Sequence, residues 1–273
     1  MRVVLFCGGM GTRLRDYSDQ IPKPMVPIGY RPVLWHVMKY YADFGYKDFI
    51  LCLGYKADVI KNYFLNYDES LSNDFVFAQG GKEIQLLHSD ISDWRITFVD
   101  TGLTSTIAQR LMSVRKYLGN DEVFLANYSD GLTDFPLPEL IKRHQVNGAI
   151  ASFLCIKPRH SFHVIDADEE TGRVTKIEDT TTADFWVNGG YFVMSRDIFD
   201  YIGKDDELVD EPFHRLISKG KLYAHKYEGF WGCMDTYKEK QMLDDLFDSG
   251  RAPWTDRREL VVPEGENHDK ACS

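Results

Sequence analysis

The sequence predicts an α/β protein built on a mostly parallel β-sheet, with helices on both faces and some antiparallel strands. Two observations predict this fold. Short apolar segments alternate with segments of helical periodicity over the first 156 residues. The apolar segments are continuous rather than alternating, which is typical of strands buried on both faces. The alternation therefore favours a Rossmann-like sheet covered by helices.

The first half of the chain supplies most of the sheet. "RVVLFC" (2–7) is rich in β-branched and aromatic residues and is expected to be a buried strand. Proline begins the first expected helix, and Gly45 and Gly119 end two of the helices. The expected strands are 2–7, 48–53, 96–99, 122–127 and 149–156, and the expected helices are 32–44, 56–67, 105–118 and 137–147.

The pattern changes after residue 160. "FHVIDAD", "GRVTKIED" and "NGGYFVMS" are shorter apolar segments separated by turn residues, and we expect them to add antiparallel strands to the main sheet. Helices are expected over 208–219 and 235–249. With no repeat or low-complexity linker, we expect one domain over 1–254 and a flexible polar tail over 255–273.

Composition limits the function. The 273 residues carry a net charge of −10, which argues against nucleic acid or an anionic membrane as partner but leaves small anionic substrates open. No apolar run approaches 18 residues, and the opening run is too short for a signal peptide, so a soluble, cytoplasmic protein is expected. The five cysteines form no CxxC pair and indicate neither zinc nor disulfides.

The segment "VVLFCGGMGTRLRDYSDQIPKPM" (3–25) carries the clearest chemical signal. Glycines after a buried strand let backbone N–H groups approach a phosphate. The spacing matches neither the P-loop nor the dinucleotide-binding pattern, so glycines alone would favour a tight turn. Cationic side chains then change the interpretation, because arginine and lysine bind phosphate oxygens. The candidate phosphate-binding residues are Gly8, Gly9, Gly11, Thr12, Arg13 and Lys23.

"GGMGTRL…KPM" resembles the signature of the sugar-phosphate nucleotidylyltransferases. Further blocks, among them "LWHVMKYY", "VDTG" and "FWGCMDT", are similar to those of the bacterial glucose-1-phosphate cytidylyltransferases, in order over about residues 2–254. The resemblance implies a nucleotide-diphospho-sugar transferase fold. It also implies that the protein joins CTP to a sugar 1-phosphate, releases pyrophosphate and uses Mg²⁺.

The resemblance also implies residue roles. The catalytic residues would be Arg13 on the pyrophosphate, Lys23 on the phosphates being joined, and Asp130, which with Asp235 would hold Mg²⁺. Taken alone, Asp130 fits a turn before Gly131, and Asp235 fits a helix N-cap.

The expected binding residues extend this set, and each has an ordinary alternative. Arg110 would lie near the nucleotide, although alone it would be a solvated helix charge. Asn188, Gly189 and Gly190 match the sugar-binding block of the family, or form a strand-entry turn.

Two departures from the family pattern affect specificity. Ala108 and Gln109 replace a Gly-Gly pair before Arg110, and Gln109 is a candidate to contact the base. Thr180 falls where the family has a lysine on the sugar phosphate. The candidates to replace that cation are Lys176, Lys157, Arg159 and His160, and the predicted substrate-binding set is Asn188, Gly189, Lys176 and Thr180.

These departures leave alternatives open. The acceptor could be another sugar phosphate, a cyclitol phosphate or a phosphonate, and the nucleotide could be another NTP. A non-catalytic nucleotide-binding relative is a further alternative, which intact Arg13, Lys23, Asp130 and Asp235 argue against. By resemblance we expect a homo-oligomer, with segment 62–95 as a candidate contact region.

Overall fold

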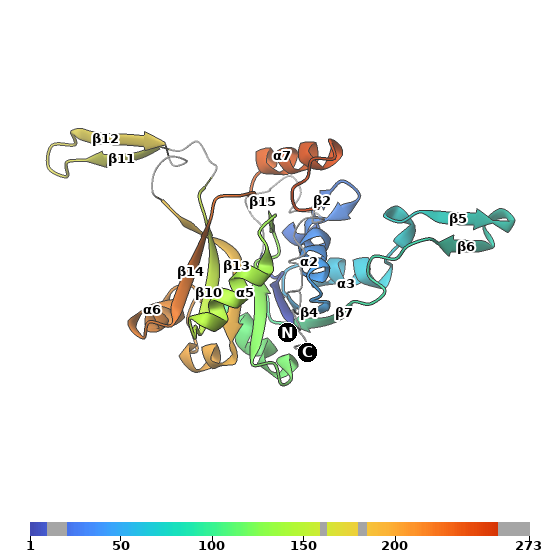
Figure 1. Ribbon diagram of the computed structural model, residues 1–273, viewed down its shortest axis with the longest axis horizontal. Helices are drawn as coiled ribbons and strands as arrows, with labels where there is room; N and C mark the ends of the chain where they lie inside the picture. The colour runs from blue at the N-terminus through green and yellow to red at the C-terminus, as the bar shows by residue number, and fades with distance from the viewer. Residues whose placement is uncertain (10–20, 159–162, 180–184, 256–273) are drawn as a thin grey trace, which may run out of the picture.

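A seven-stranded sheet forms the centre of the computed structural model, which describes residues 1–9, 21–158, 163–179 and 185–255 (Figure 1). In spatial order its strands are β14 (Leu222–Tyr227), β10 (Ala151–Ile156), β13 (Val187–Ser195), β8 (Val123–Asn127), β1 (Val3–Phe6), β4 (Asp48–Leu53) and β7 (Arg95–Asp100).

The sheet is parallel except at one strand. β8, β1, β4 and β7 run parallel to one another, and β10 runs parallel to β14. β13 is antiparallel to both of its neighbours, β8 and β10. The predicted mostly parallel sheet with antiparallel additions is confirmed.

Helices cover both faces of this sheet. They are α2 (Val33–Asp43), α3 (Ala57–Leu65), α4 (Ile107–Val114), α5 (Leu137–Val146), α6 (Glu211–Ser218) and α7 (Tyr237–Asp248). Val3 and Leu5 of β1 pack in one core with residues of α2, α3, α5 and α7, whereas Val4 and Phe6 pack in a second core with α4 and α6. Alternate residues of one strand thus enter opposite cores, which is why these strands are continuously apolar.

Four small ribbons lie outside the main sheet. They are β2 (Pro27–Ile28) with β3 (Arg31–Pro32), β5 (Phe75–Ala78) with β6 (Glu83–Leu86), β9 (Gly131–Thr133) with β15 (Trp231–Cys233), and β11 (His163–Ala167) with β12 (Val174–Asp179). Figure 1 shows β5–β6 and β11–β12 projecting from opposite sides of the body. The expectation that "FHVIDAD" and "GRVTKIED" join the main sheet is wrong, because these strands pair only with each other.

Residues from Val3 to Trp254 contribute to the buried core. This supports the predicted single domain over 1–254, which stays a prediction; the expected tail lies, after Thr255, outside the described residues. Within the described part of the chain, none of the helices has the length and hydrophobicity needed to cross a bilayer. The four cysteines described are buried and free, as expected for cysteines with a packing role.

Candidate active site

The glycine-rich segment begins at the carboxyl end of β1. A Cβ atom added to Gly8 would lie 2.1 Å from Nη1 of Arg110, so that glycine leaves room for the arginine. Among the described residues, a Cβ added to Gly9 would meet no heavy atom within 4 Å. Gly11, Thr12 and Arg13 lie outside the described residues. The described part of the loop is therefore braced at Gly8.

Arg110 is the brace. Its side chain comes from α4, and the residue is 3% exposed. Its guanidinium donates hydrogen bonds to the carbonyl oxygens of Gly8 (3.2 Å), Leu53 (3.2 Å) and Leu103 (3.3 Å), and to the hydroxyl of Thr101 (2.8 Å). These acceptors belong to the ends of β1, β4 and β7. Arg110 thus ties three strand ends together beneath the glycine segment, where it is not a solvated helix charge.

Gln109 has a different environment. Its side-chain oxygen accepts a hydrogen bond from the N–H of Thr106 (3.0 Å), which completes a capping box at the start of α4. Its side-chain nitrogen donates to the carbonyl of Lys204 (3.0 Å). Both ends of the Gln109 amide are thus used, one to cap the helix and the other to fix a loop.

Three of the predicted residues do meet. Lys23 lies in a short 3-10 helix, Lys23–Met25, and its Nζ is 2.5 Å from Oδ2 of Asp130. The same Nζ contacts Oδ1 of Asp235. Asp130 and Asp235 are 107 and 212 positions from Lys23 along the chain, yet both contact its ammonium group.

Local backbone structure explains how each aspartate is aimed. Asp130 follows Ser129, which has a left-handed backbone (φ 66°) unusual for a residue with a side chain. Ser129 is held there because its N–H donates to Oδ1 of Asn127 (2.8 Å) and its hydroxyl donates to the carbonyl of Phe6 (2.8 Å). The strained turn thus places Asp130 at the carboxyl edge of the sheet, where such folds bind ligands.

Asp235 reaches the same point from the end of β15. The N–H of Met234 donates to the carbonyl of Asp130 (3.0 Å), which fixes the two backbones side by side. Oε2 of Glu239 accepts hydrogen bonds from the N–H groups of Asp235 (3.0 Å) and Thr236 (2.7 Å). Thr236 is the N-cap of α7, so the alternative helix-cap role of Asp235 is wrong, and the carboxylate of Asp235 contacts Lys23.

The three charges depend on one another. Burial acts to lower the pKa of Lys23, but Asp130 and Asp235 outweigh it through charge and hydrogen bonding, and the pKa is raised. The pKa of Asp130 is raised, first by burial and then by the charge of Asp235, although Lys23 opposes both effects. Two carboxylates placed this close therefore need a cation between them.

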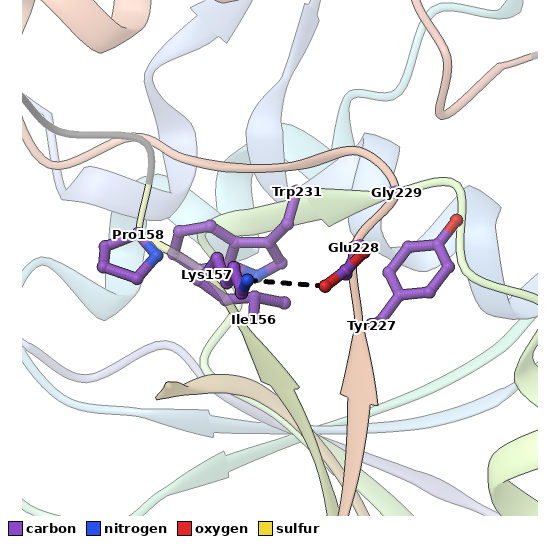
Figure 2. Close-up of a pocket in the computed structure, with 7 residues that line it drawn as sticks. All are labelled: Ile156, Lys157, Pro158, Tyr227, Glu228, Gly229 and Trp231. Atoms are coloured by element: carbon purple, nitrogen blue, oxygen red, sulfur yellow. Dashed lines mark ion pairs between the residues drawn. The ribbon is translucent and has the colours of Figure 1, made fainter. Parts of the chain in front are cut away.

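A second part of the candidate site is a cavity of about 290 Å³ at the carboxyl ends of β10 and β14 (Figure 2). Gly189 lies beside it: its carbonyl accepts a hydrogen bond from Nε1 of Trp231 (2.8 Å), and an added Cβ would lie 3.3 Å from that nitrogen. The lining residues are Ile156, Lys157, Pro158, Tyr227, Glu228, Gly229 and Trp231.

Asn188 connects the cavity wall to the aspartate turn. Its Nδ2 donates to the hydroxyl of Tyr128 (3.3 Å), two residues before Asp130, and its Oδ1 accepts from the N–H of Gly190 (2.9 Å). Gly190 has a left-handed backbone (φ 78°), and an added Cβ would lie 2.7 Å from the Tyr128 ring. This is the strand-entry turn that the sequence indicated as the alternative role.

The lysines that were candidates to replace the family lysine lie in different parts of the structure. Lys157 lines the cavity, where its Nζ lies 3.5 Å from Oε1 of Glu228, as Figure 2 shows. Lys176 lies on the projecting β11–β12 ribbon, largely exposed and paired with Glu178 at 2.7 Å. The structure therefore brings Lys157, and not Lys176, to the candidate site; Arg159, His160 and Thr180 lie outside the described residues.

Comparison with known proteins gives this geometry a context. Residues 2–236 match the family described as Nucleotidyl transferase. The chain belongs to this family. The chain is 38% identical over 256 residues to a probable glucose-1-phosphate cytidylyltransferase of Bacillus subtilis, covering 93% of this chain and 99% of that protein. It is equally identical to the glucose-1-phosphate cytidylyltransferase of Salmonella typhi, covering 93% and 98%.

Solved structures agree on the fold of this nucleotidyltransferase. A UDP-glucose pyrophosphorylase complexed with UDP-glucose superimposes with a TM-score of 0.66, at 15% identity, over 92% of this chain and 99% of the other. A putative glucose-1-phosphate thymidylyltransferase of Bacillus anthracis gives 0.65 at 16% identity, over 95% and 98%. At these identities the likeness shows the nucleotide-sugar transferase-like fold alone.

The carboxylates fit the metal that nucleotidyl transfer generally needs. Asp130 and Asp235 offer one oxygen each to a single point, which is the small carboxylate set that Mg²⁺ takes together with water and substrate phosphates. Among the described residues, no group of three or more His, Cys, Asp or Glu side chains could form a fuller protein cage. The donor set thus suits a metal whose other ligands come from substrate and water.

Sequence reasoning missed a second lysine near the cavity, which contacts the same aromatic ring as the cavity residue Lys157. Lys226 on β14 places its Nζ 4.8 Å from the centre of the Trp186 ring, and Lys157 lies 5.3 Å from the same ring. Lys226 was missed because β14 ("LYAHKY") lacks the continuous apolar run that identified the other strands of the sheet.

Proposed function

We propose that this nucleotidyltransferase is a glucose-1-phosphate cytidylyltransferase, joining CTP and glucose 1-phosphate to give CDP-glucose and pyrophosphate. The observation that carries the proposal is the convergence of Lys23, Asp130 and Asp235 beside the glycine segment. It is supported by 38% identity to glucose-1-phosphate cytidylyltransferases over nearly the whole of each chain.

In this reaction an oxygen of the sugar phosphate attacks the α-phosphorus of CTP, and pyrophosphate leaves. The protein positions the groups and neutralises their charge. Gly8 and Gly9 offer backbone to the phosphates, and Arg110 holds Gly8 in place. Lys23 supplies positive charge to the phosphates being joined, and Arg13 has the predicted role of binding the departing pyrophosphate.

Asp130 and Asp235 are proposed to hold Mg²⁺, which when bound would neutralise phosphate charge. The remaining nucleotide assignments, Gly11 and Thr12, stay predictions. Arg110 is proposed to act from beneath the loop rather than on the base, and Gln109 keeps only an indirect role through the start of α4.

The acceptor is proposed to occupy the cavity beside Gly189 and Asn188. Lys157 is the cation available there among the described candidates, and we propose that it contacts the acceptor phosphate in place of the family lysine. The alternative acceptor classes (another sugar phosphate, a cyclitol phosphate or a phosphonate) rest on the same replacement.

We also propose that the protein forms a homo-oligomer through the β5–β6 ribbon, within the predicted contact segment 62–95. The cross-strand pairs Phe75–Leu86 and Phe77–Ile84 place four large apolar side chains on one face of the ribbon. These side chains are between 36 and 63% exposed, and exposed apolar patches of this kind mark interaction sites. A cytoplasmic location stays a prediction.

The test is pyrophosphate release with Mg²⁺, crossing CTP, UTP, dTTP, ATP and GTP with glucose 1-phosphate and other phosphorylated acceptors. Fast release with CTP and glucose 1-phosphate alone is expected. Lys23→Ala should lower kcat by about 10²-fold or more, because a preorganised charge is lost. Lys39→Ala, which removes a surface lysine paired with Asp43, is the matched control and should leave kcat unchanged.

Other outcomes reassign the function. Turnover with CTP only on another acceptor would support the acceptor alternative. Nucleotide binding with no turnover on any acceptor would support the non-catalytic relative, and an unchanged rate in Lys23→Ala would show that the site assignment is wrong.

A further inference from the structure

Lys23 lies at the point where a cation shared by Asp130 and Asp235 would lie. Its ammonium contacts one oxygen of each carboxylate, and these two contacts define the point. Contacts other than those of Lys23 position the two carboxylates. The left-handed backbone of Ser129 orients Asp130, and the hydrogen bond from the N–H of Met234 to the carbonyl of Asp130 places Asp235 beside it. The carboxylate pair therefore forms one cation position, and Lys23 fills it.

An ammonium and a divalent cation exclude each other from such a position. Mg²⁺ coordinates oxygen at about 2.0–2.1 Å, whereas Lys23 Nζ is 2.5 Å from Oδ2 of Asp130. Two cations bound to the same oxygens would be nearly in contact, and their repulsion is strong at a site that is largely shielded from water. Entry of the metal thus requires Lys23 to leave.

When nucleotide is present, its phosphates offer Lys23 another anionic group to contact. Lys23 lies between two prolines, on a segment 107 and 212 positions away from the two aspartates along the chain. A triphosphate brings several negative charges to the adjoining glycine segment, and these attract both the ammonium and a divalent cation. With nucleotide, the site can hold both cations on separate anionic groups.

We propose that Lys23 occupies the carboxylate pair in the nucleotide-free protein, and that a divalent cation gains the pair only as the triphosphate draws the lysine away. This inference rests on the proposed nucleotidyl transfer for the identity of the anion. It makes binding of metal and of nucleotide mutually dependent, with Lys23 as the residue that couples them.

The test measures Mn²⁺ binding to nucleotide-free protein by the loss of the free-Mn²⁺ EPR signal. It is run at pH 8, so that the carboxyl groups stay ionised without the ammonium. Lys23→Gln and Lys23→Met should each bind Mn²⁺ at least tenfold more tightly than wild type. Adding Asp130→Asn to either variant should abolish the gain, which places the bound Mn²⁺ at the pair.

Lys240→Gln is the matched control. The Lys240 side chain is about as buried as that of Lys23 (11% against 14% exposed) and is paired with Asp244, but it lies on α7. Its removal should leave Mn²⁺ binding unchanged. Folded Lys23 variants that bind Mn²⁺ no more tightly than wild type would overturn the proposal.

Comparing wild type with Asp130→Asn tests the proposal even if neither Lys23 variant folds. Because Lys23 fills the pair, Asp130→Asn alone should change the weak Mn²⁺ binding of nucleotide-free protein less than twofold. A tenfold loss would mean that the pair binds metal with Lys23 present, and would overturn the inference. Turnover is scored separately: wild type that makes CDP-glucose keeps the proposed function whatever the EPR result, and wild type that makes none leaves the metal competition standing.

Discussion

Replacing Arg110 with methionine tests whether one buried guanidinium holds together the ends of three strands of the sheet. The substitution keeps an unbranched side chain of similar length but removes the four hydrogen bonds to Gly8, Leu53, Leu103 and Thr101. A hydrogen bond to a charged group contributes about 1.5–3 kcal/mol, but these four share one group and are not additive. Arg110→Met leaves buried neutral acceptors without this donor, at about 1–3 kcal/mol for each one left unsatisfied, so a loss of about 3–5 kcal/mol is expected in the free energy of unfolding.

The assays are urea unfolding and thermal unfolding, each followed by circular dichroism, together with steady-state kinetics. For a chain of this size the loss corresponds to a decrease in Tm of about 6–20 °C, at roughly 2–4 °C per kcal/mol. The KM for CTP should rise as well, because the carbonyl of Gly8 loses its brace. Arg115→Met is the control: this arginine follows α4 directly, is exposed and stacks on Phe199, so its loss should cost less than about 1 kcal/mol. A destabilisation below 1 kcal/mol in Arg110→Met, with KM unchanged, would refute the reasoning.

Two further predictions concern regions away from the site. Phe77→Asp places a charge on the apolar face of the β5–β6 ribbon, so it should convert the expected oligomer to smaller species, as measured by light scattering coupled to gel filtration. Gln85→Asp, on the other face, should leave the mass unchanged. Identical masses for wild type and both variants would contradict the proposed interface. Burial lowers the pKa of His144 from 6.5 to about 4 between the hydroxyls of Ser152 and Ser195. The unfolded chain therefore binds the proton first as the pH falls below 6.5, and stability falls until about pH 4. Between pH 7.5 and pH 5, wild type should lose about 2 kcal/mol more than His144→Asn, as measured by urea unfolding at both pH values; equal losses would show that His144 is not the group responsible.

Much of the fold follows from the first half of the sequence. The strand 48–53 and the helix 32–44 were predictable almost to the residue, because the apolar period is set by packing on both faces of one sheet. β6, β11, β12 and β14 carry mixed polar and apolar residues, whereas β5 ("FVFA") is apolar but exposed. Apolar pattern alone therefore could not separate a strand of the main sheet from a free ribbon.

The site shows the same division. The candidates Lys23, Asp130 and Asp235 were predictable because each combines a local signal with a family resemblance: flanking prolines for Lys23, a strand end for Asp130 and a helix start for Asp235. The burial of Arg110 was not predictable, because its acceptors are backbone carbonyls on three strands that sequence pattern does not bring together. Lys176 was a reasonable candidate by sequence, yet its strand leaves the body and Lys157 lines the cavity instead.

The pairing of β9 with β15 has a consequence for how the protein is made. Residues 131–133 meet residues 231–233, so the second carboxylate joins the first only after most of the chain exists. A nascent chain that has emerged as far as residue 230 carries Lys23 and Asp130 but not Asp235, Glu239 or α7. Synthesis from the N-terminus therefore completes the sheet first and the two-carboxylate site almost last, so that a chain released early cannot assemble the proposed metal-binding pair.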